Sequence, residues 1–114
     1  TDSSNIIQLY SISGTTSWGW DILNGGVVQF TGSSTMALGR NKIAIGYKLN
    51  DMVIYKNGTL VASDATCTVP ATSALGIAGP FNGVVGAQLA ASVNQSILFQ
   101  TRLTNTQLQS LTSL

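Results

Sequence analysis

The chain has 114 residues, enough for one domain with its own core, yet only 8% of them are charged. Glutamate and histidine are absent and the net charge is +1, so Ser, Thr, Asn, Gln and Gly supply most of the polar surface. A near-neutral chain without a basic stripe offers little attraction to phosphate backbones or acidic membranes. We therefore expect no nucleic acid partner.

Neither a membrane span nor a disulfide is expected. The uncharged stretch 65–101 is interrupted by prolines, glycines and amides, so it lacks the continuous apolar run of a membrane-crossing helix. We therefore expect no membrane insertion. Cys67 is the single cysteine and lies among alternating apolar residues, which favours a small buried side chain. The chain begins without methionine, and we expect residues 1–114 to be a single β-sandwich domain, the C-terminal part of a longer protein.

Short runs of strand-forming residues follow one another with turn residues between them. In chain order, they predict strands over residues 6–12, 17–23, 27–30, 42–49, 52–56, 60–63, 66–69, 75–78, 84–89 and 96–101. Asn24-Gly25-Gly26 supplies a turn signal between the second and third strands. This rhythm predicts an all-β, antiparallel sandwich or barrel.

The clearest local prediction is a charged double hairpin over residues 42–64. Alternate residues Ile43, Ile45, Tyr47 and Leu49 share one face, which we expect to be buried. Asn57-Gly58 predicts a two-residue turn, because both of its positions require positive φ. The opposite face carries small and charged side chains, and we expect it to be solvated.

The end of the chain predicts one short helix. Thr104 and Gln107 have the spacing of a capping box, and Leu103 and Leu108 are placed as a hydrophobic staple. Leucines at 108, 111 and 114 recur at helical spacing, so we expect a single apolar stripe packed on the sheets.

Catalysis finds little support in the residues present. Without histidine, no Ser-His-Asp or Cys-His constellation is possible within the chain, and a zinc site loses its commonest ligand. A glycosidase needs two carboxylates at a defined separation, and no pair among the four aspartates of the chain stands out as its acid and base. We expect no enzyme, no catalytic residue, no cofactor and no metal. An unconventional Asp-based site, or calcium bound by Asp21 and Asn24, are the weaker alternatives.

Trp18 and Trp20 are the candidate ligand-binding residues. They share one strand face across Gly19, and paired indoles stack against sugar rings, so the pair is a candidate glycan platform. The alternative is that two such large aromatic side chains belong to the core or to a subunit interface.

Residues 41–112 resemble the concanavalin A-like, laminin-G-like sandwich modules of bacteriophage tail fibres and tail-associated proteins. The resemblance lies in the strand NKIAIGYK (41–48), the hairpin NDMVIYKNG (50–58) and the ending FQTRLTNTQLQSLT (99–112). The ending is similar to the family pattern R-L-T-x-x-x-L-x-x-L-T, with Gln107 where an acidic residue is usual. Residues 1–39 match only loosely, as a strand-turn-strand segment.

The resemblance implies a fold and a setting. The fold is an antiparallel β-sandwich of jelly-roll, concanavalin A-like type with one short C-terminal helix. The setting is a non-enzymatic structural or adhesion domain of a phage tail fibre or tail spike, extracellular and virion-borne, which helps contact host surface glycans. Its expected partners are two further copies in a homotrimer, other virion tail proteins and host surface polysaccharide. The alternative is a carbohydrate-binding module of a secreted bacterial protein.

Overall fold

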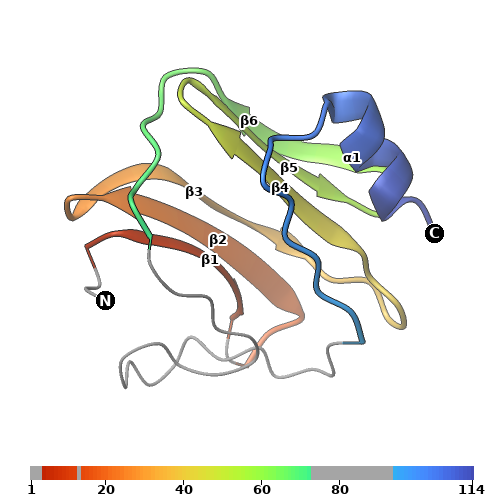
Figure 1. The fold of residues 1–114 in the computed structure, drawn as a ribbon. Helices are drawn as coiled ribbons and strands as arrows, with labels where there is room; N and C mark the ends of the chain where they lie inside the picture. The colour runs from red at the N-terminus through yellow and green to blue at the C-terminus, as the bar shows by residue number, and fades with distance from the viewer. Residues whose placement is uncertain (1–3, 13, 73–93) are drawn as a thin grey trace. The chain divides into compact units, whose positions relative to one another are not determined.

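The computed structural model describes residues 4–12, 14–72 and 94–114, which form two three-stranded antiparallel sheets and one helix (Figure 1). Contacts between residues divide the chain into two units. One unit contains sheet A, made of β1, β2 and β3; the other contains sheet B, made of β4, β5 and β6, together with α1. The predicted all-β class, with antiparallel sheets and one short C-terminal helix, is confirmed.

Sheet A is a meander of β1 (Ile6–Ser11), β2 (Ser17–Asn24) and β3 (Val27–Thr35). The predicted turn between β2 and β3 is present, and Gly25 and Gly26 both take positive φ, which glycine adopts without steric cost. β3 runs five residues beyond its predicted end at Phe30, through Thr-Gly-Ser-Ser-Thr. The composition of this polar extension is typical of a loop, but its backbone pairs with β2 along its whole length.

Sheet B is the predicted double hairpin, with β4 (Ile43–Lys48), β5 (Asp51–Lys56) and β6 (Thr59–Asp64). Asn57 and Gly58 form the two-residue turn with φ of 49° and 80°, as expected. The Asn57 side chain adds a second role, because its Oδ1 accepts a hydrogen bond from the backbone N–H of Lys42 at 2.8 Å. The turn therefore also holds the entry to β4.

Helix α1 (Asn105–Thr112) begins with the predicted capping box, in which Thr104 and Gln107 satisfy each other's backbone N–H groups. It packs on sheet B through Leu108, which joins Val53 and Tyr55 in a core cluster that Ala44 and Leu103 flank. Gly46 permits the close approach, because a Cβ there would lie 2.7 Å from a methyl group of Leu108. The face of the double hairpin expected to be solvated therefore carries the helix, and its small residues provide the space.

Arg102 fixes the segment that leads into α1. Its guanidinium is largely buried and donates to the Asp51 carboxylate at 2.8 Å, to the Leu103 carbonyl and to Asn105 Oδ1. At the other end of the helix, Lys42 Nζ donates to the Ser113 carbonyl at 2.8 Å, where a cation is favourable. Charged side chains of the double hairpin thus hold both ends of α1.

Some predicted elements differ from the structure. Residues 66–69 and 96–101 form no strand. In the first segment, the Thr66 N–H and hydroxyl both donate to Asp64 Oδ1, which makes a turn. The predicted strands 75–78 and 84–89 lie outside the described residues. On α1, the buried side chains are Leu108 and Thr112, at i, i+4 spacing, and Leu111 is exposed. Leu114 lies beyond the end of α1 and is also exposed, so the predicted stripe of three leucines is wrong.

The helix packing predicts a contrast between two leucines of the same helix. Leu108→Ala, at a side chain only 4% exposed, should lower the free energy of unfolding by about 2–5 kcal/mol through lost packing. The matched control Leu111→Ala, at a side chain 42% exposed, should cost under about 1 kcal/mol. Urea denaturation of both variants measures the difference, and equal losses would contradict the packing described.

Candidate functional site

The two faces of sheet A differ in chemistry because its strands alternate side chains. Trp18, Trp20 and Ile22 lie on one face of β2, and Gly19 and Asp21 lie on the other. The paired residues of β1 and β3 continue each face, since directly paired residues of an antiparallel sheet point the same way. One face is therefore aromatic and apolar, and the other is polar.

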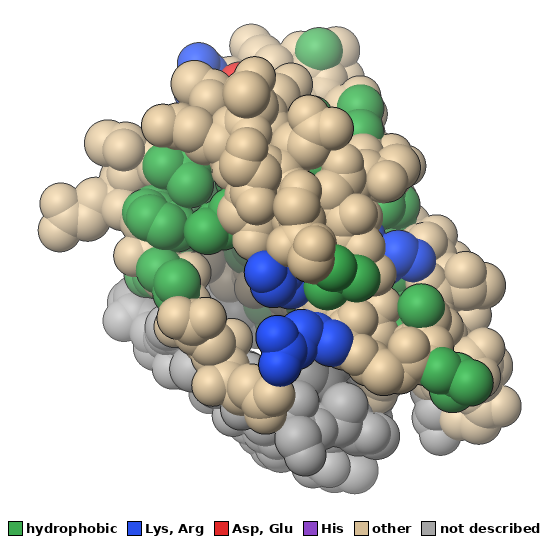
Figure 2. Space-filling model, turned by 90° about the vertical axis from the view of Figure 1, so that its right-hand side faces the viewer, with side chains coloured by type: hydrophobic (Ala, Val, Ile, Leu, Met, Phe, Trp, Pro, Cys, Tyr) green, Lys and Arg blue, Asp and Glu red, His purple; other side chains and the backbone are tan. Residues whose placement is uncertain are grey.

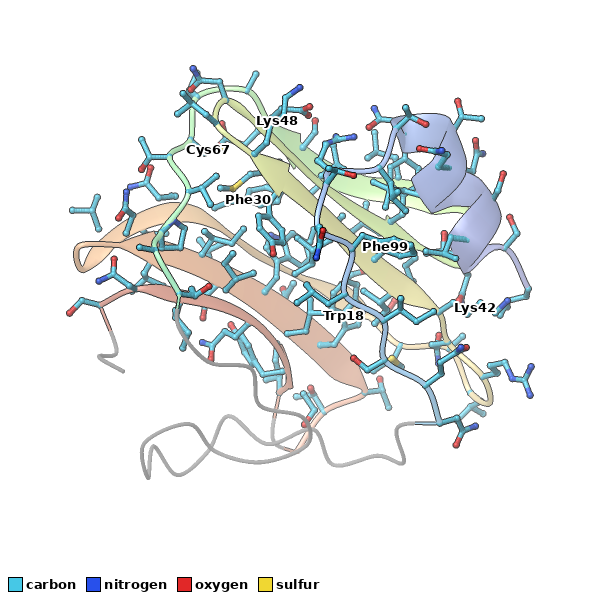
Figure 3. The ribbon with its side chains drawn as sticks, in the orientation of Figure 1. Trp18, Phe30, Lys42, Lys48, Cys67 and Phe99 are labelled. Carbon is cyan, nitrogen blue, oxygen red and sulfur yellow. The ribbon has the colours of Figure 1, made fainter. Side chains whose placement is uncertain are left out.

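The tryptophan pair belongs to the apolar face and is buried. Trp18 and Trp20 are 1% and 3% exposed, with ring centroids 5.3 Å apart and tilted by 46°. Trp20 also packs on Phe30, and Gly32 leaves room for its indole; Figure 3 draws Trp18 and Phe30 on the same side of sheet A. A buried indole presents no ring face to a sugar, so in this structure the pair is part of a core and not an exposed platform. Its two indole N–H groups have no hydrogen-bond partner among the described residues.

The polar face centres on Asp21, and we call it the Asp21 face: Gln8, Tyr10, Gly19, Asp21, Thr31 and Ser33. The register brings these residues into two adjacent rows, Gln8–Asp21–Thr31 and Tyr10–Gly19–Ser33. Thr31 and Ser33 are exposed, and Gln8, Tyr10 and Asp21 are partly exposed. Two residues from each of three strands thus lie side by side on one face of the sheet.

The Asp21 carboxylate organises this face. Thr31 Oγ1 donates to Oδ1 at 2.5 Å, and Gln8 Nε2 donates to Oδ2 at 3.1 Å. Tyr10 hydrogen-bonds to the same carboxylate diagonally across the sheet. A carboxylate has about four acceptor positions, so three donors leave room for about one more. The carboxylate is held in place and still able to accept a hydrogen bond from a ligand.

Tyr10 lies along the sheet, over Gly19. A Cβ on Gly19 would be 2.7 Å from the Tyr10 Cζ, so any other residue there would push the ring away. Burial, then the charge of Asp21 and its hydrogen bond, raise the pKa of the Tyr10 hydroxyl. The phenol therefore remains a hydrogen-bond donor throughout the neutral pH range.

Other chemistry is limited in the described residues. No group of three or more His, Cys, Asp or Glu side chains in ranges 4–12, 14–72 and 94–114 is placed to hold a metal ion. Asp21 and Asn24, three residues apart on β2, point to opposite faces, so they do not form the calcium pair considered above. Cys67 is buried as expected, and burial followed by the charge of Asp64 raises the pKa of its thiol. Within the part of the chain that the structure describes, no helix has the length and apolar character to span a membrane.

A shallow apolar groove runs along α1. It has a volume of about 490 Å³ and is lined by Phe99, Leu103, Thr106, Gln107, Ser110 and Leu111. The lining contains no charged side chain, and nothing in the structure shows what covers it. Figure 2 shows one side of the molecule, where most side chains are polar or apolar and a few Lys and Arg side chains are visible, two of them close together. Compared with this groove, the Asp21 face has a charged acceptor and several hydrogen-bonding groups in fixed positions, so it is the better candidate site.

Comparison with known proteins adds information about the fold. No protein-family model matches the chain, and no curated protein matches it. Among solved structures, it is similar to an S-layer domain-containing protein from Clostridium thermocellum, with a TM-score of 0.50 and 15% sequence identity. The similarity covers 97% of this chain and 64% of that chain. At this identity the likeness concerns the fold alone.

Burial and the contact with Asp21 predict that the Tyr10 hydroxyl ionises at a higher pH than an ordinary tyrosine. A raised pKa in the folded state means that the contribution of Tyr10 to stability is complete below its ordinary pKa of 10.0 and is lost as pH rises through the folded value. Stability should therefore fall above about pH 10 more steeply in the natural chain than in Tyr10→Phe.

The measurement is absorbance of tyrosinate at alkaline pH, with the Tyr10 component taken as the difference from Tyr10→Phe. Asp21→Asn should lower the pKa of Tyr10, because it removes the carboxylate charge. Asp64→Asn, which makes the same change on sheet B, should leave it unchanged. An identical Tyr10 titration in the natural chain and in Asp21→Asn would contradict the contact.

Proposed function

We propose that this chain is a non-enzymatic adhesion domain of a virion tail fibre or tail spike and that it contacts host surface glycans through the Asp21 face. The observation that carries the proposal is the Asp21 face itself. It combines a positioned carboxylate, amide and hydroxyl groups, and an aromatic ring lying along the sheet. Sugars are recognised by this combination of hydrogen-bonding groups and a ring surface.

The setting is supported by the resemblance of residues 41–112 to tail-fibre modules and by the structural likeness to an S-layer domain-containing protein. The solved structure is described as an S-layer domain-containing protein, and an extracellular or surface-associated setting is the part of the proposal that agrees with that name. The structure also gives the family ending R-L-T a physical role here: Arg102 binds Asp51, Leu103 packs on the core cluster, and Thr104 caps α1. These roles support the fold part of the resemblance.

A carbohydrate-binding module of a secreted bacterial protein is the second candidate, and it would use the same face. The two candidates differ in assembly and location. A tail-fibre domain belongs to a homotrimeric protein carried on virions, whereas a secreted module acts in a protein that no virion carries. Antibody labelling of virions separates them.

The proposal predicts that the intact protein containing this chain is a trimer by light scattering and sediments with host cells. Asp21→Asn should reduce the bound fraction severalfold, because it removes the charged acceptor of the face. Asp64→Asn, which changes the net charge equally, should bind as the natural protein does. A monomer that ignores host cells and their stripped polysaccharide would overturn the proposal.

A further inference from the structure

The charge distribution limits what the Asp21 face can bind. Residues 1–35, which include all of sheet A, contain no lysine or arginine, and their carboxylates are Asp2 and Asp21. The five basic residues all lie between Arg40 and Arg102, in the unit of sheet B. Proteins hold carboxylate or phosphate groups of a ligand mainly through charge-assisted bonds from such cations. An acidic sugar on this face would meet a carboxylate and no cation of sheet A.

The hydrogen-bonding groups favour a ligand that both donates and accepts. Asp21 can accept about one more hydrogen bond, which a ligand hydroxyl can donate. Gln8 uses one amide hydrogen on Asp21 and has a second available for a ligand. Thr31 and Ser33 are exposed residues beside it; the Ser33 hydroxyl can donate or accept, whereas the Thr31 hydroxyl already donates to Asp21 and can only accept. Ligand hydroxyl groups match both kinds of partner.

The aromatic ring supplies the apolar part of the contact. Because Gly19 has no side chain, the Tyr10 ring lies along the sheet beside Asp21 and does not stand away from it. A partly exposed ring in this position can pack against the C–H groups of a pyranose ring. The buried tryptophans of the opposite face have no part in the contact.

We infer that the ligand of the Asp21 face is an uncharged, hydroxyl-rich saccharide, with its ring on Tyr10 and a hydroxyl donating to Asp21. The inference rests on the proposed glycan-binding function and adds the class of sugar. Two features of the face carry it, namely a carboxylate with acceptor capacity left and the absence of lysine and arginine from the three strands.

The test compares neutral and acidic polysaccharides as ligands of the intact protein. Soluble glucan and mannan are the neutral probes, polygalacturonate is the acidic probe, and polysaccharide stripped from the host is separated into neutral and acidic fractions. We expect retention by a neutral probe or by the neutral host fraction, and no retention by acidic material at equal ionic strength. Asp21→Asn should weaken neutral binding about tenfold or more, and Asp64→Asn should not change it.

Ser33→Leu gives a second variant, at an exposed position that takes part in no described core. It should block neutral binding by filling the surface beside Tyr10, with unchanged thermal unfolding. Preference for acidic polysaccharide, or neutral binding that is the same in Asp21→Asn and Ser33→Leu, would overturn the inference and leave the adhesion function standing. Retention by no polysaccharide, host material included, would overturn the glycan-binding function itself.

Discussion

The antiparallel register of sheet A is the constraint on which the candidate site depends. Asp21 is paired with Gln8 on one side and Thr31 on the other, so its two oxygens each receive a donor from a neighbouring strand. A slip of one residue would exchange the two faces of a strand and place Asp21 where Trp20 lies. The burial of three large side chains on the apolar face, Trp18, Trp20 and Ile22, opposes that slip. The polar face is therefore positioned by the packing of the apolar one.

The two units differ in the kinds of side chains that they carry. Sheet B and α1 pack together through Leu108, which contacts Val53 and Tyr55. The Arg102–Asp51 ion pair fixes the segment just before the helix. The residues that carry the family resemblance lie mainly here, and their contacts explain stability. Sheet A is the part that resembles known modules least, and it carries the combination of groups suited to a ligand. The residues of the resemblance thus account for the fold of sheet B and α1, while the proposed ligand-binding groups come from the strands outside it.

Local signals in the sequence were sufficient for much of the fold. The Asn57-Gly58 turn, the Gly25-Gly26 turn and the Thr104 capping box were predictable because each depends on a few adjacent residues. The strand over residues 31–35 was not predictable, because Thr, Gly and Ser are typical of loops. Its pairing with β2 overrides this local preference. The segments 66–69 and 96–101 show the reverse case, strand-like composition without strand pairing.

The candidate site was harder to predict than the fold. The large indoles of Trp18 and Trp20 favour their own face of β2 as the candidate site, and that face is buried. Their alternation with Gly19 and Asp21 indicates an opposite, polar face. The sequence does not indicate Thr31 and Ser33 as neighbours of Asp21, because their place beside it depends on the register of a third strand whose polar end has loop-like composition. The most direct test of the account is amide NMR of the isotope-labelled protein during titration with stripped host polysaccharide. The account predicts shifts concentrated on β1, β2 and β3 around Asp21, and shifts confined to sheet B and the groove of α1 would contradict it.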